Sequence, residues 1–136
     1  MDFVKSIAIA ASGLRAQAGR MRVISENIAN ADSTAQTPGG EPYRRKIPTF
    51  TSQLDRALDA RVVGLARTRP DMSELQSKYQ PNHPAADAKG YVKYPNVNSL
   101  VELTDMREAQ RSYEANLNVV GAARRMLQRT LDILRT

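Results

Sequence analysis

The distribution of proline constrains this 136-residue sequence more than any other feature. All seven prolines lie between Pro38 and Pro95, and residues 1–37 and 96–136 contain none. Proline removes a backbone hydrogen bond and clashes with the preceding turn of a helix. The sequence therefore predicts two helix-forming ends around a middle that is hostile to helices, within a length that suits one domain.

The first end carries a seven-residue repeat that predicts one long helix. Eight positions, seven of them apolar, are spaced alternately three and four residues apart: Val4, Ile7, Ala11, Leu14, Ala18, Met21, Ser25 and Ile28. This spacing is the seam of a coiled-coil helix, and a helix from about residue 3 to 29 is roughly 40 Å long. Gly13 and Gly19 permit close approach but cost about 1 kcal/mol each in a helix, so this helix needs packing partners. Asn30, Asp32 and Ser33 are expected to end it.

The last end shows the same spacing on a broader apolar face. Its first stripe comprises Leu103, Met106, Gln110, Tyr113, Leu117, Val120, Arg124, Leu127, Leu131 and Leu134, of which Gln110 and Arg124 are the polar exceptions. A second stripe beside it comprises Val119, Ala123, Met126, Thr130 and Ile133. Ser99 with Glu102 fits a capping box, which predicts a helix from about residue 100 to about 134. Two adjacent stripes make a face wider than one coiled-coil partner covers.

These patterns predict a mainly α fold, with long N- and C-terminal helices packed as a coiled-coil-like hairpin. Residues 1–33 and 98–136 are expected to form one inner helical domain, and residues 34–97 a proline-rich middle segment of short β-strands and loops. The hairpin explains one stripe on each helix and leaves the second stripe of the last helix uncovered. We therefore expect contacts between subunits in addition; a self-contained helical domain with an unknown partner is the alternative.

Short runs within the middle segment predict its strands. The strand-like runs are 43–50, 61–67 and 90–95, and residues 51–60 are expected to form a short helical turn. The first run contains Pro48, which suits an edge strand.

Few residues in this sequence are suited to catalysis or metal binding. The absence of cysteine excludes disulfides and thiolate metal sites, and the single histidine, His83, excludes sites built from several histidines. His83 lies in Asn82-His83-Pro84 near Asp87, without a nucleophile beside it in sequence, so a loop-ordering role is expected. We expect no enzyme activity, no cofactor and no metal. No apolar run approaches the roughly 20 residues that span a bilayer.

The charge of the chain is spread along its length. Lysine plus arginine is 20 and aspartate plus glutamate is 14, and the net charge of +6 divides into excesses of 2, 3 and 1 over residues 1–30, 31–99 and 100–136. A nucleic-acid-binding protein clusters its basic residues on one face or arm. The nearest cluster, Arg44-Arg45-Lys46, is expected to be a solvated strand edge. A basic nucleic-acid-binding helical protein stays an alternative; it predicts strongly salt-dependent binding to DNA.

Several motifs resemble a known family. Ser12-Gly13-Leu14, Ala16-Gln17, Arg20, Val23-Ile24 and Asn27-Ile28-Ala29-Asn30, followed by Tyr43-Arg44-Arg45 and Phe50, look like the amino-terminal pattern of bacterial flagellar rod, hook and hook-associated proteins. A more specific likeness, to a subunit of the proximal rod, lies in Tyr79 to Asp87, Gly90-Tyr91-Val92, Tyr94 to Asn98 and Tyr113-Glu114-Ala115-Asn116. The resemblance covers about residues 3 to 134 with the order of motifs kept.

The resemblance implies a structural subunit of a hollow helical shaft in the flagellar basal body. Its terminal helices would pack in an inner layer against neighbouring subunits, with the middle segment outside. The implied partners are other rod proteins, copies of the chain itself and the junction between the rod base and the membrane ring. The implied route is the flagellar type III export apparatus, without a cleaved signal peptide, to a place within the periplasm. No nucleic acid and no small-molecule substrate are expected.

On this basis we expect two sets of functional residues. The subunit-interface set, which includes residues that order the turn after the first helix, is Leu14, Met21, Ile28, Asn27, Asn30, Tyr43, Arg44, Leu117, Val120, Met126, Leu127, Leu131 and Leu134. The outer-loop set is Pro81, Asn82, His83 and Pro84.

Overall fold

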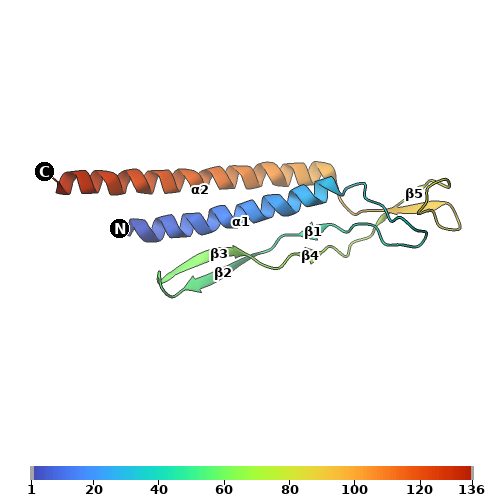
Figure 1. Cartoon of the computed structure of the whole chain (residues 1–136), viewed down its shortest axis with the longest axis horizontal. Helices are drawn as coiled ribbons and strands as arrows, with labels where there is room; N and C mark the ends of the chain where they lie inside the picture. Colours follow the sequence, from blue (N-terminus) through green and yellow to red (C-terminus); the bar gives the residue numbers. More distant parts are fainter. Residues whose placement is uncertain (1, 136) are drawn as a thin grey trace. The chain divides into compact units, whose positions relative to one another are not determined.

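The computed structural model describes residues 2–135 and contains two long helices and six short strands (Figure 1). The helices are α1 (Phe3–Ala29) and α2 (Ser99–Leu134). The strands are β1 (Lys46–Ile47), β2 (Phe50–Asp55), β3 (Ala60–Leu65), β4 (Arg69–Pro70), β5 (Gln76–Tyr79) and β6 (Tyr91–Tyr94). The two helices and the middle of short strands are confirmed, whereas packing of the helices as a coiled coil stays a prediction.

The strands pair as three separate two-stranded antiparallel sheets. β2 pairs with β3, β1 with β4, and β5 with β6. The register of the β2–β3 hairpin places Phe50 opposite Leu65 and Asp55 opposite Ala60. The helical turn expected for residues 51–60 is wrong, because β2 runs to Asp55 and the hairpin turns there. Asp55 Oδ1 accepts hydrogen bonds from the N–H groups of Ala57 and Leu58, which stabilises that turn.

The chain divides into two compact units. The first unit comprises Met1–Met21, Thr49–Arg67 and Arg107–Thr136, and the second comprises Arg22–Pro48 and Thr68–Met106. Each unit contains parts of both helices and part of the middle segment. The predicted inner helical domain and outer middle segment describe the chain within an assembled shaft, so both stay predictions.

In the first unit, α1 lies between the β2–β3 hairpin and α2 (Figure 1). Ser12 Oγ accepts a hydrogen bond from the Val63 N–H at 3.2 Å and donates to Ile9 O at 2.6 Å, which ties the hairpin to the helix. A Cβ on Gly13 would lie 2.8 Å from Asn116 Oδ1, and a Cβ on Gly19 would lie 2.9 Å from Leu65. The two glycines therefore permit the close approach that the sequence indicated.

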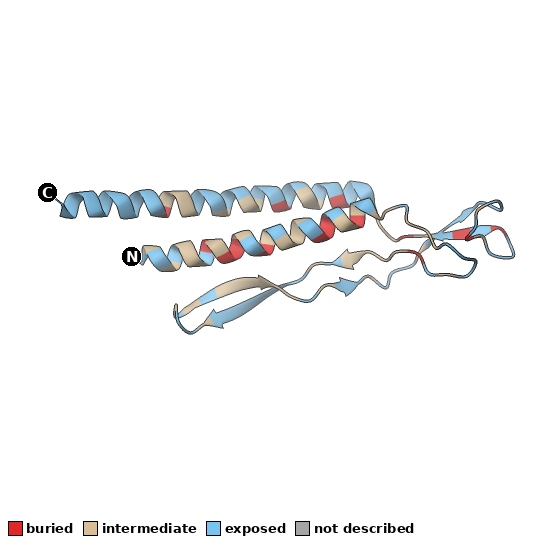
Figure 2. Cartoon of the chain, viewed as in Figure 1, coloured by how far each residue is buried: buried red, intermediate tan, exposed pale blue. Residues whose placement is uncertain are grey.

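The most buried positions of α1 lie beside the predicted apolar seam rather than on it. Ala10, Gly13, Ile24 and Asn27 are buried, each one residue before a seam position. The seam residues expected at subunit interfaces, Leu14, Met21 and Ile28, are only half-buried. In the first unit the buried positions of α1 are small, namely Ala10, Ser12, Gly13 and Ala16, because close packing requires small residues at the contact. Nearer its end, α1 buries Val23, Ile24 and Asn27. Figure 2 shows the buried positions concentrated along α1 and sparse along α2.

The cap of α2 differs from the predicted capping box. Asn98 Oδ1 accepts from the N–H groups of Leu100 and Val101, and Asn98 O accepts from Glu102 N. Asn98 is therefore the N-cap in place of Ser99, and Glu102 is free for another role. Neither helix, within the described residues, is apolar over a length that could cross a membrane.

Gly13→Ala should lower the free energy of unfolding by about 1–2 kcal/mol, because its methyl group would overlap the Asn116 amide. Gly121→Ala is the matched control, because its Cβ would lie 3.4 Å from the far end of the Arg125 side chain. It should raise the free energy of unfolding by about 0.5–1 kcal/mol, the gain expected when alanine replaces glycine in a helix. Urea unfolding followed by helical circular dichroism measures both. Gly13→Ala combined with Asn116→Ala should recover most of the loss; no recovery would contradict the packing described.

Candidate functional site

Asn27 lies in the last turn of α1 and uses the full hydrogen-bonding capacity of its side chain. Nδ2 donates to Lys46 O at 2.9 Å and to Glu102 Oε2 at 3.1 Å. Oδ1 accepts from Lys46 N at 2.9 Å and from the Tyr43 hydroxyl at 2.8 Å. An amide offers two donors and two acceptor sites, so all four are satisfied in a fully buried residue. Asn27 thereby joins the end of α1 to β1 and to the first turn of α2.

Glu102 is the second centre of this arrangement, with only 1% of its surface exposed. Its Oε1 accepts from Arg45 Nε at 2.5 Å, and the other guanidinium nitrogens of Arg45 lie 3.7 Å from the carboxylates of Asp71 and Asp105. Burial by itself lowers the pKa of Arg45, but the hydrogen bond and charge of Glu102, with the two aspartates, outweigh it and the pKa is raised. A buried carboxylate is tolerated only when paired and hydrogen-bonded, as here.

Asn96 extends the arrangement to the segment before β5. Its Oδ1 accepts from Arg45 N at 2.8 Å, and its Nδ2 donates to Asp71 O at 3.0 Å and to Ser73 Oγ at 2.8 Å. Hydrogen bonds from Ser73, and the charge of Arg45, lower the pKa of the Asp71 carboxyl. We call Asn27, Tyr43, Arg45, Asn96 and Glu102 the Asn27 cluster.

The structure brings two of the predicted turn residues into the Asn27 cluster and leaves two outside it. Asn27 and Tyr43 are members, and burial together with the charges of Glu26 and Glu102 raises the pKa of Tyr43 to about 12. Asn30 instead holds the end of α1, since its Nδ2 donates to Glu26 O and its Oδ1 accepts from Ser33. Arg44 donates to Glu41 and to the Ser73 carbonyl.

The sequence reasoning missed the roles of three cluster residues. Glu102 was assigned to a capping box, Arg45 to a solvated edge, and Asn96 to no role. The expected solvated edge at Arg44-Arg45-Lys46 is wrong for Arg45, which pairs with the buried Glu102. Lys46 Nζ pairs with Glu26, but about 40% of each side chain is exposed. The polar residues around β1 were the one sequence feature that could have indicated a buried polar cluster. They do not reveal that the partner of Arg45 is Glu102, which is distant in the sequence.

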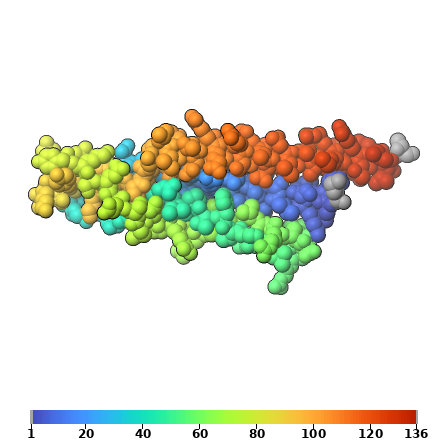
Figure 3. All heavy atoms as spheres, turned by 180° about the vertical axis from the view of Figure 1, so that it is seen from behind, coloured from blue at the N-terminus to red at the C-terminus, as the bar shows by residue number. Residues whose placement is uncertain are grey.

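A second surface lies on the C-terminal half of α2 and is almost uncovered. Every described residue from 124 to 135 is exposed. The large apolar side chains exposed on this half are Leu117, Val119, Met126, Leu127, Leu131, Ile133 and Leu134. Val120, also expected at an interface, is half-buried. On the face drawn in Figure 3, the orange-to-red spheres of these last turns lie at the surface. We call residues 117–134 the α2 outer face.

The outer-loop residues form a turn between β5 and β6. Pro81, Asn82 and Pro84 are exposed. His83 Nδ1 accepts from Ala85 N at 3.1 Å, so Nε2 carries the proton and lies 3.4 Å from Thr34 Oγ1. Asp87 does not pair with His83. These contacts are compatible with the predicted loop-ordering role of His83, which stays a prediction.

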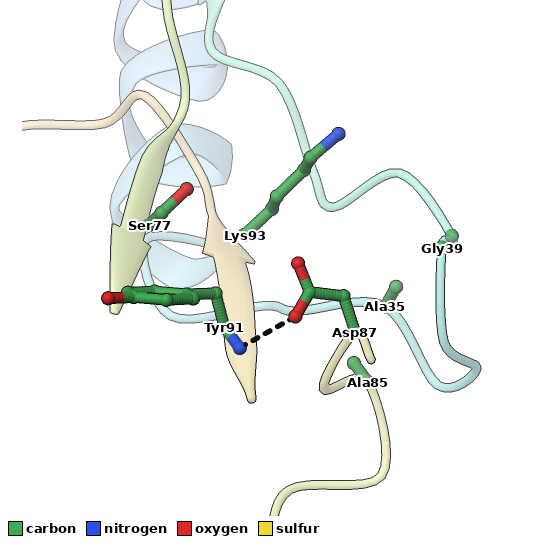
Figure 4. Close-up of a pocket in the computed structure, with 8 residues that line it drawn as sticks. Ala35, Gly39, Ser77, Ala85, Asp87, Tyr91 and Lys93 are labelled. Atoms are coloured by element: carbon green, nitrogen blue, oxygen red, sulfur yellow. Dashed lines mark hydrogen bonds between the residues drawn. The ribbon is translucent and has the colours of Figure 1, made fainter. Parts of the chain in front are cut away.

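A small cavity of about 60 Å³ lies beside this turn (Figure 4). Asp87 Oδ1 accepts from the N–H of Tyr91 at 2.9 Å, which lowers the pKa of the Asp87 carboxyl. Tyr91 packs edge-on against Tyr79 with ring centres 5.4 Å apart, over Gly90 at φ +82°. The cavity is too small for a cofactor, and residues 2–135 contain no group of three acidic or histidine side chains placed to hold a metal ion.

Comparison with known proteins points to the axial proteins of the bacterial flagellum. The family of flagella basal body rod proteins matches residues 7–35, which include most of α1. The family of the flagellar basal body rod FlgEFG protein C-terminal region matches residues 88–133, which include most of α2. The two matches place both long helices within this class.

Whole-length relatives narrow the class. The chain is 50% identical to the flagellar basal-body rod protein FlgC of Agrobacterium fabrum over 93% of this chain and 91% of that protein. It is 41% identical to FlgC of Borreliella burgdorferi over 98% of this chain and 99% of that protein. It is 37% identical to FlgC of Bacillus subtilis, again over 98% and 99%. The chain belongs to the FlgC family of flagellar basal-body rod proteins.

Asn27→Asp should destabilise the fold by about 2–4 kcal/mol. The carboxylate cannot donate to Lys46 O, and it would add a negative charge beside the buried Glu102. Asn118→Asp, at an exposed position, makes the same chemical change and should stay within about 0.5 kcal/mol of the wild type. Urea unfolding compares the two, and equal effects would show that the Asn27 cluster does not hold the fold.

Tyr43 should be the source of an alkaline loss of stability between pH 10 and 12. A phenol whose pKa rises from 10.0 to about 12 on folding stabilises the fold fully below pH 10 and loses that contribution as the pH rises toward 12. Ultraviolet titration of tyrosinate in the wild type, minus that of Tyr43→Phe, isolates this group. The difference should titrate near pH 12 in the folded protein and near pH 10 in urea; the same midpoint in both would contradict the assignment.

Proposed function

We propose that this chain is a structural, non-enzymatic subunit of the proximal rod, in the hollow shaft that transmits torque through the flagellar basal body. The observation that carries the proposal is the α2 outer face, where residues 124–135 are all exposed although five of them are large and apolar. Burying each such side chain contributes about 1.5–3 kcal/mol. A subunit that leaves this face open gains that stability only on assembly.

Membership of the FlgC family supports assembly with other rod components at the basal body. We further propose that the partners are copies of the chain, other rod proteins and the junction of the rod base with the membrane ring. Export by the flagellar type III apparatus without a cleaved peptide, to a place within the periplasm, completes the proposal. A chain without cysteine has no disulfide to hinder passage through a narrow channel.

The packing of α1 and α2 as a coiled-coil-like inner layer belongs to the same proposal. The half-buried seam of Leu14, Met21 and Ile28 has surface left for a neighbouring helix. The nucleic-acid alternative loses support, because Arg45 and Lys46 in the run Arg44-Arg45-Lys46 are paired with glutamates of the same chain. The charge of Arg45 is therefore already neutralised by a buried carboxylate rather than presented to phosphates.

Leu127→Asp should abolish incorporation into the rod and swimming, because it places a charge in an apolar subunit contact. Asn118→Asp adds the same charge on the opposite side of α2 and should assemble normally. Both variants are expressed in a strain lacking the chromosomal gene, and isolated basal bodies are imaged by electron microscopy. Intact rods with Leu127→Asp, or complete rods in the deletion strain itself, would overturn the proposed function.

A further inference from the structure

The β2–β3 hairpin of the first unit has one covered edge and one open edge. In Figure 1, β3 lies between α1 and β2. The Val63 N–H on β3 donates to Ser12 Oγ of α1, so the outer edge of β3 is tied to the helix. β2 has no such cover, because it pairs with β3 alone and every residue from Phe50 to Leu54 is exposed. The hairpin therefore presents β2 as its free edge.

The register of the hairpin shows which backbone groups of β2 point outward. The Ala66 N–H donates to Thr49 O at 2.7 Å, which makes this a hydrogen-bonded pair. Such pairs alternate along an antiparallel ladder with pairs that exchange no hydrogen bonds. Phe50, Ser52 and Leu54 belong to the second kind, so their N–H and C=O groups point away from β3. None of these groups has a hydrogen-bond partner within residues 2–135.

This edge lacks the features by which proteins protect free strands. The stretch from Phe50 to Leu54 contains neither a charged residue nor a proline. Its two large apolar side chains are exposed, Phe50 by 39% and Leu54 by 60%. The strands of the other two sheets are two to four residues long, so β2 is the longest open edge in the part of the chain that the structure describes. An unprotected edge of this kind is a template for another strand.

The sequence of β2 is complementary to itself when two copies run antiparallel. With Ser52 opposite Ser52 of the second copy, Phe50 lies opposite Leu54 and Thr51 lies opposite Gln53. Apolar side chains then meet on one face of the sheet and polar side chains on the other. The same register places outward-pointing backbone groups against outward-pointing ones, as a hydrogen-bonded ladder requires.

Other registers of the same two strands are less favourable. A slip by one residue sets outward-pointing groups against inward-pointing ones. A slip by two residues keeps the match but brings Pro48 opposite Leu54, or Arg56 opposite Phe50. Proline has no N–H to donate, and the arginine would replace an apolar contact with a charge. The register centred on Ser52 is therefore the preferred one.

We propose that two free copies of this chain pair through β2, antiparallel about Ser52, and form one sheet in the order β3–β2–β2–β3. The outward N–H and C=O groups of Phe50, Ser52 and Leu54 make the new ladder. Phe50 of each copy covers Leu54 of the other. The contact joins only a few residues of each chain, so the dimer is weak and exchanges readily with the monomer.

This pairing goes beyond the proposed function. An antiparallel two-fold contact closes on itself, whereas a shaft requires contacts that repeat in one direction. The pairing therefore belongs to the free subunit and is given up on assembly. In the free subunit it covers an edge that is otherwise open to less specific strand pairing.

Disulfide trapping tests both the pairing and its register, since the chain has no cysteine of its own. Thr51→Cys and Gln53→Cys are prepared as separate full-length variants, mixed, oxidised and separated without reductant. In the proposed register their Cα atoms are about 4.5 Å apart, within the reach of a disulfide. Two copies of the same variant are about 7–8 Å apart, beyond that reach. The mixture should yield roughly tenfold more covalent dimer than either variant alone.

The yields decide the proposal in either direction. No covalent dimer in the mixture, or equal yields from the mixture and the single variants, would overturn it. A higher yield from Thr51→Cys alone or from Gln53→Cys alone would place the strands in another register and overturn it as well.

Ser52→Pro removes the central donor of the contact. The Ser52 N–H points outward, so proline at this position leaves the β2–β3 ladder intact. Added to both cysteine variants, it should lower the yield of trapped dimer roughly tenfold. Leu54→Lys, which sets a charge against Phe50 of the second copy, replaces it if circular dichroism shows a disturbed fold. An unchanged yield with a correctly folded variant would contradict the pairing.

The pairing and the proposed function fail separately. Leu127→Asp lies on α2, so adding it to both cysteine variants should leave the yield of trapped dimer unchanged; a lost dimer would overturn the pairing. Ser52→Pro by itself should assemble into rods, because the shaft does not use this contact. Loss of rods with a correctly folded Ser52→Pro would assign the β2 edge to assembly and overturn this inference. Intact rods with Leu127→Asp would overturn the proposed function and leave the pairing in place.

Discussion

The second unit depends on the ion pair and hydrogen bond that the buried carboxylate of Glu102 makes with Arg45 and Asn27. A carboxylate out of water is stable only with its charge balanced and its oxygens occupied, and Arg45 and Asn27 supply both. Each of those residues then fixes another part of the chain. Asn27 holds β1 through the backbone of Lys46, and Arg45 reaches Asp71 and Asn96. The strands of this unit are only two to four residues long, so its sheets contribute little stability. Hydrogen bonds between side chains hold its segments together instead.

The spacing of apolar residues predicted both helices within a residue of their observed ends, because proline-free heptads over 27 and 36 residues admit no other regular structure. The same spacing did not predict which side of α1 is buried. It identified the bulky seam at Leu14 and Met21, whereas in the first unit the chain buries the small residues Ala10, Ser12, Gly13 and Ala16. Periodicity indicates which positions share a face of the helix. It does not indicate which face packs against both α2 and the β2–β3 hairpin, because that depends on side chains small enough for close approach.

The middle segment was predictable only where apolar residues alternate. β3 and β6 fall where strands were expected, whereas the polar β5 gave no apolar signal and β2 was mistaken for a helical turn. The Asn27 cluster lay beyond the reach of the sequence for a different reason. Asn27 and Tyr43 were singled out by their resemblance to a family motif, but Glu102 is 75 residues from Asn27, and no local pattern pairs residues at that separation.

Small and large apolar residues occupy different places on the two helices. Alanine, glycine and serine meet inside the first unit, where close contact leaves little apolar surface to bury. Leucine, isoleucine and methionine lie on the α2 outer face, where a large part of their apolar surface stays exposed within one chain. Since the hydrophobic contribution grows with the area removed from water, this exposed surface contributes little to the stability of the single chain. Under the proposed function, the same surface would be buried between subunits and would add its stability to the assembled rod.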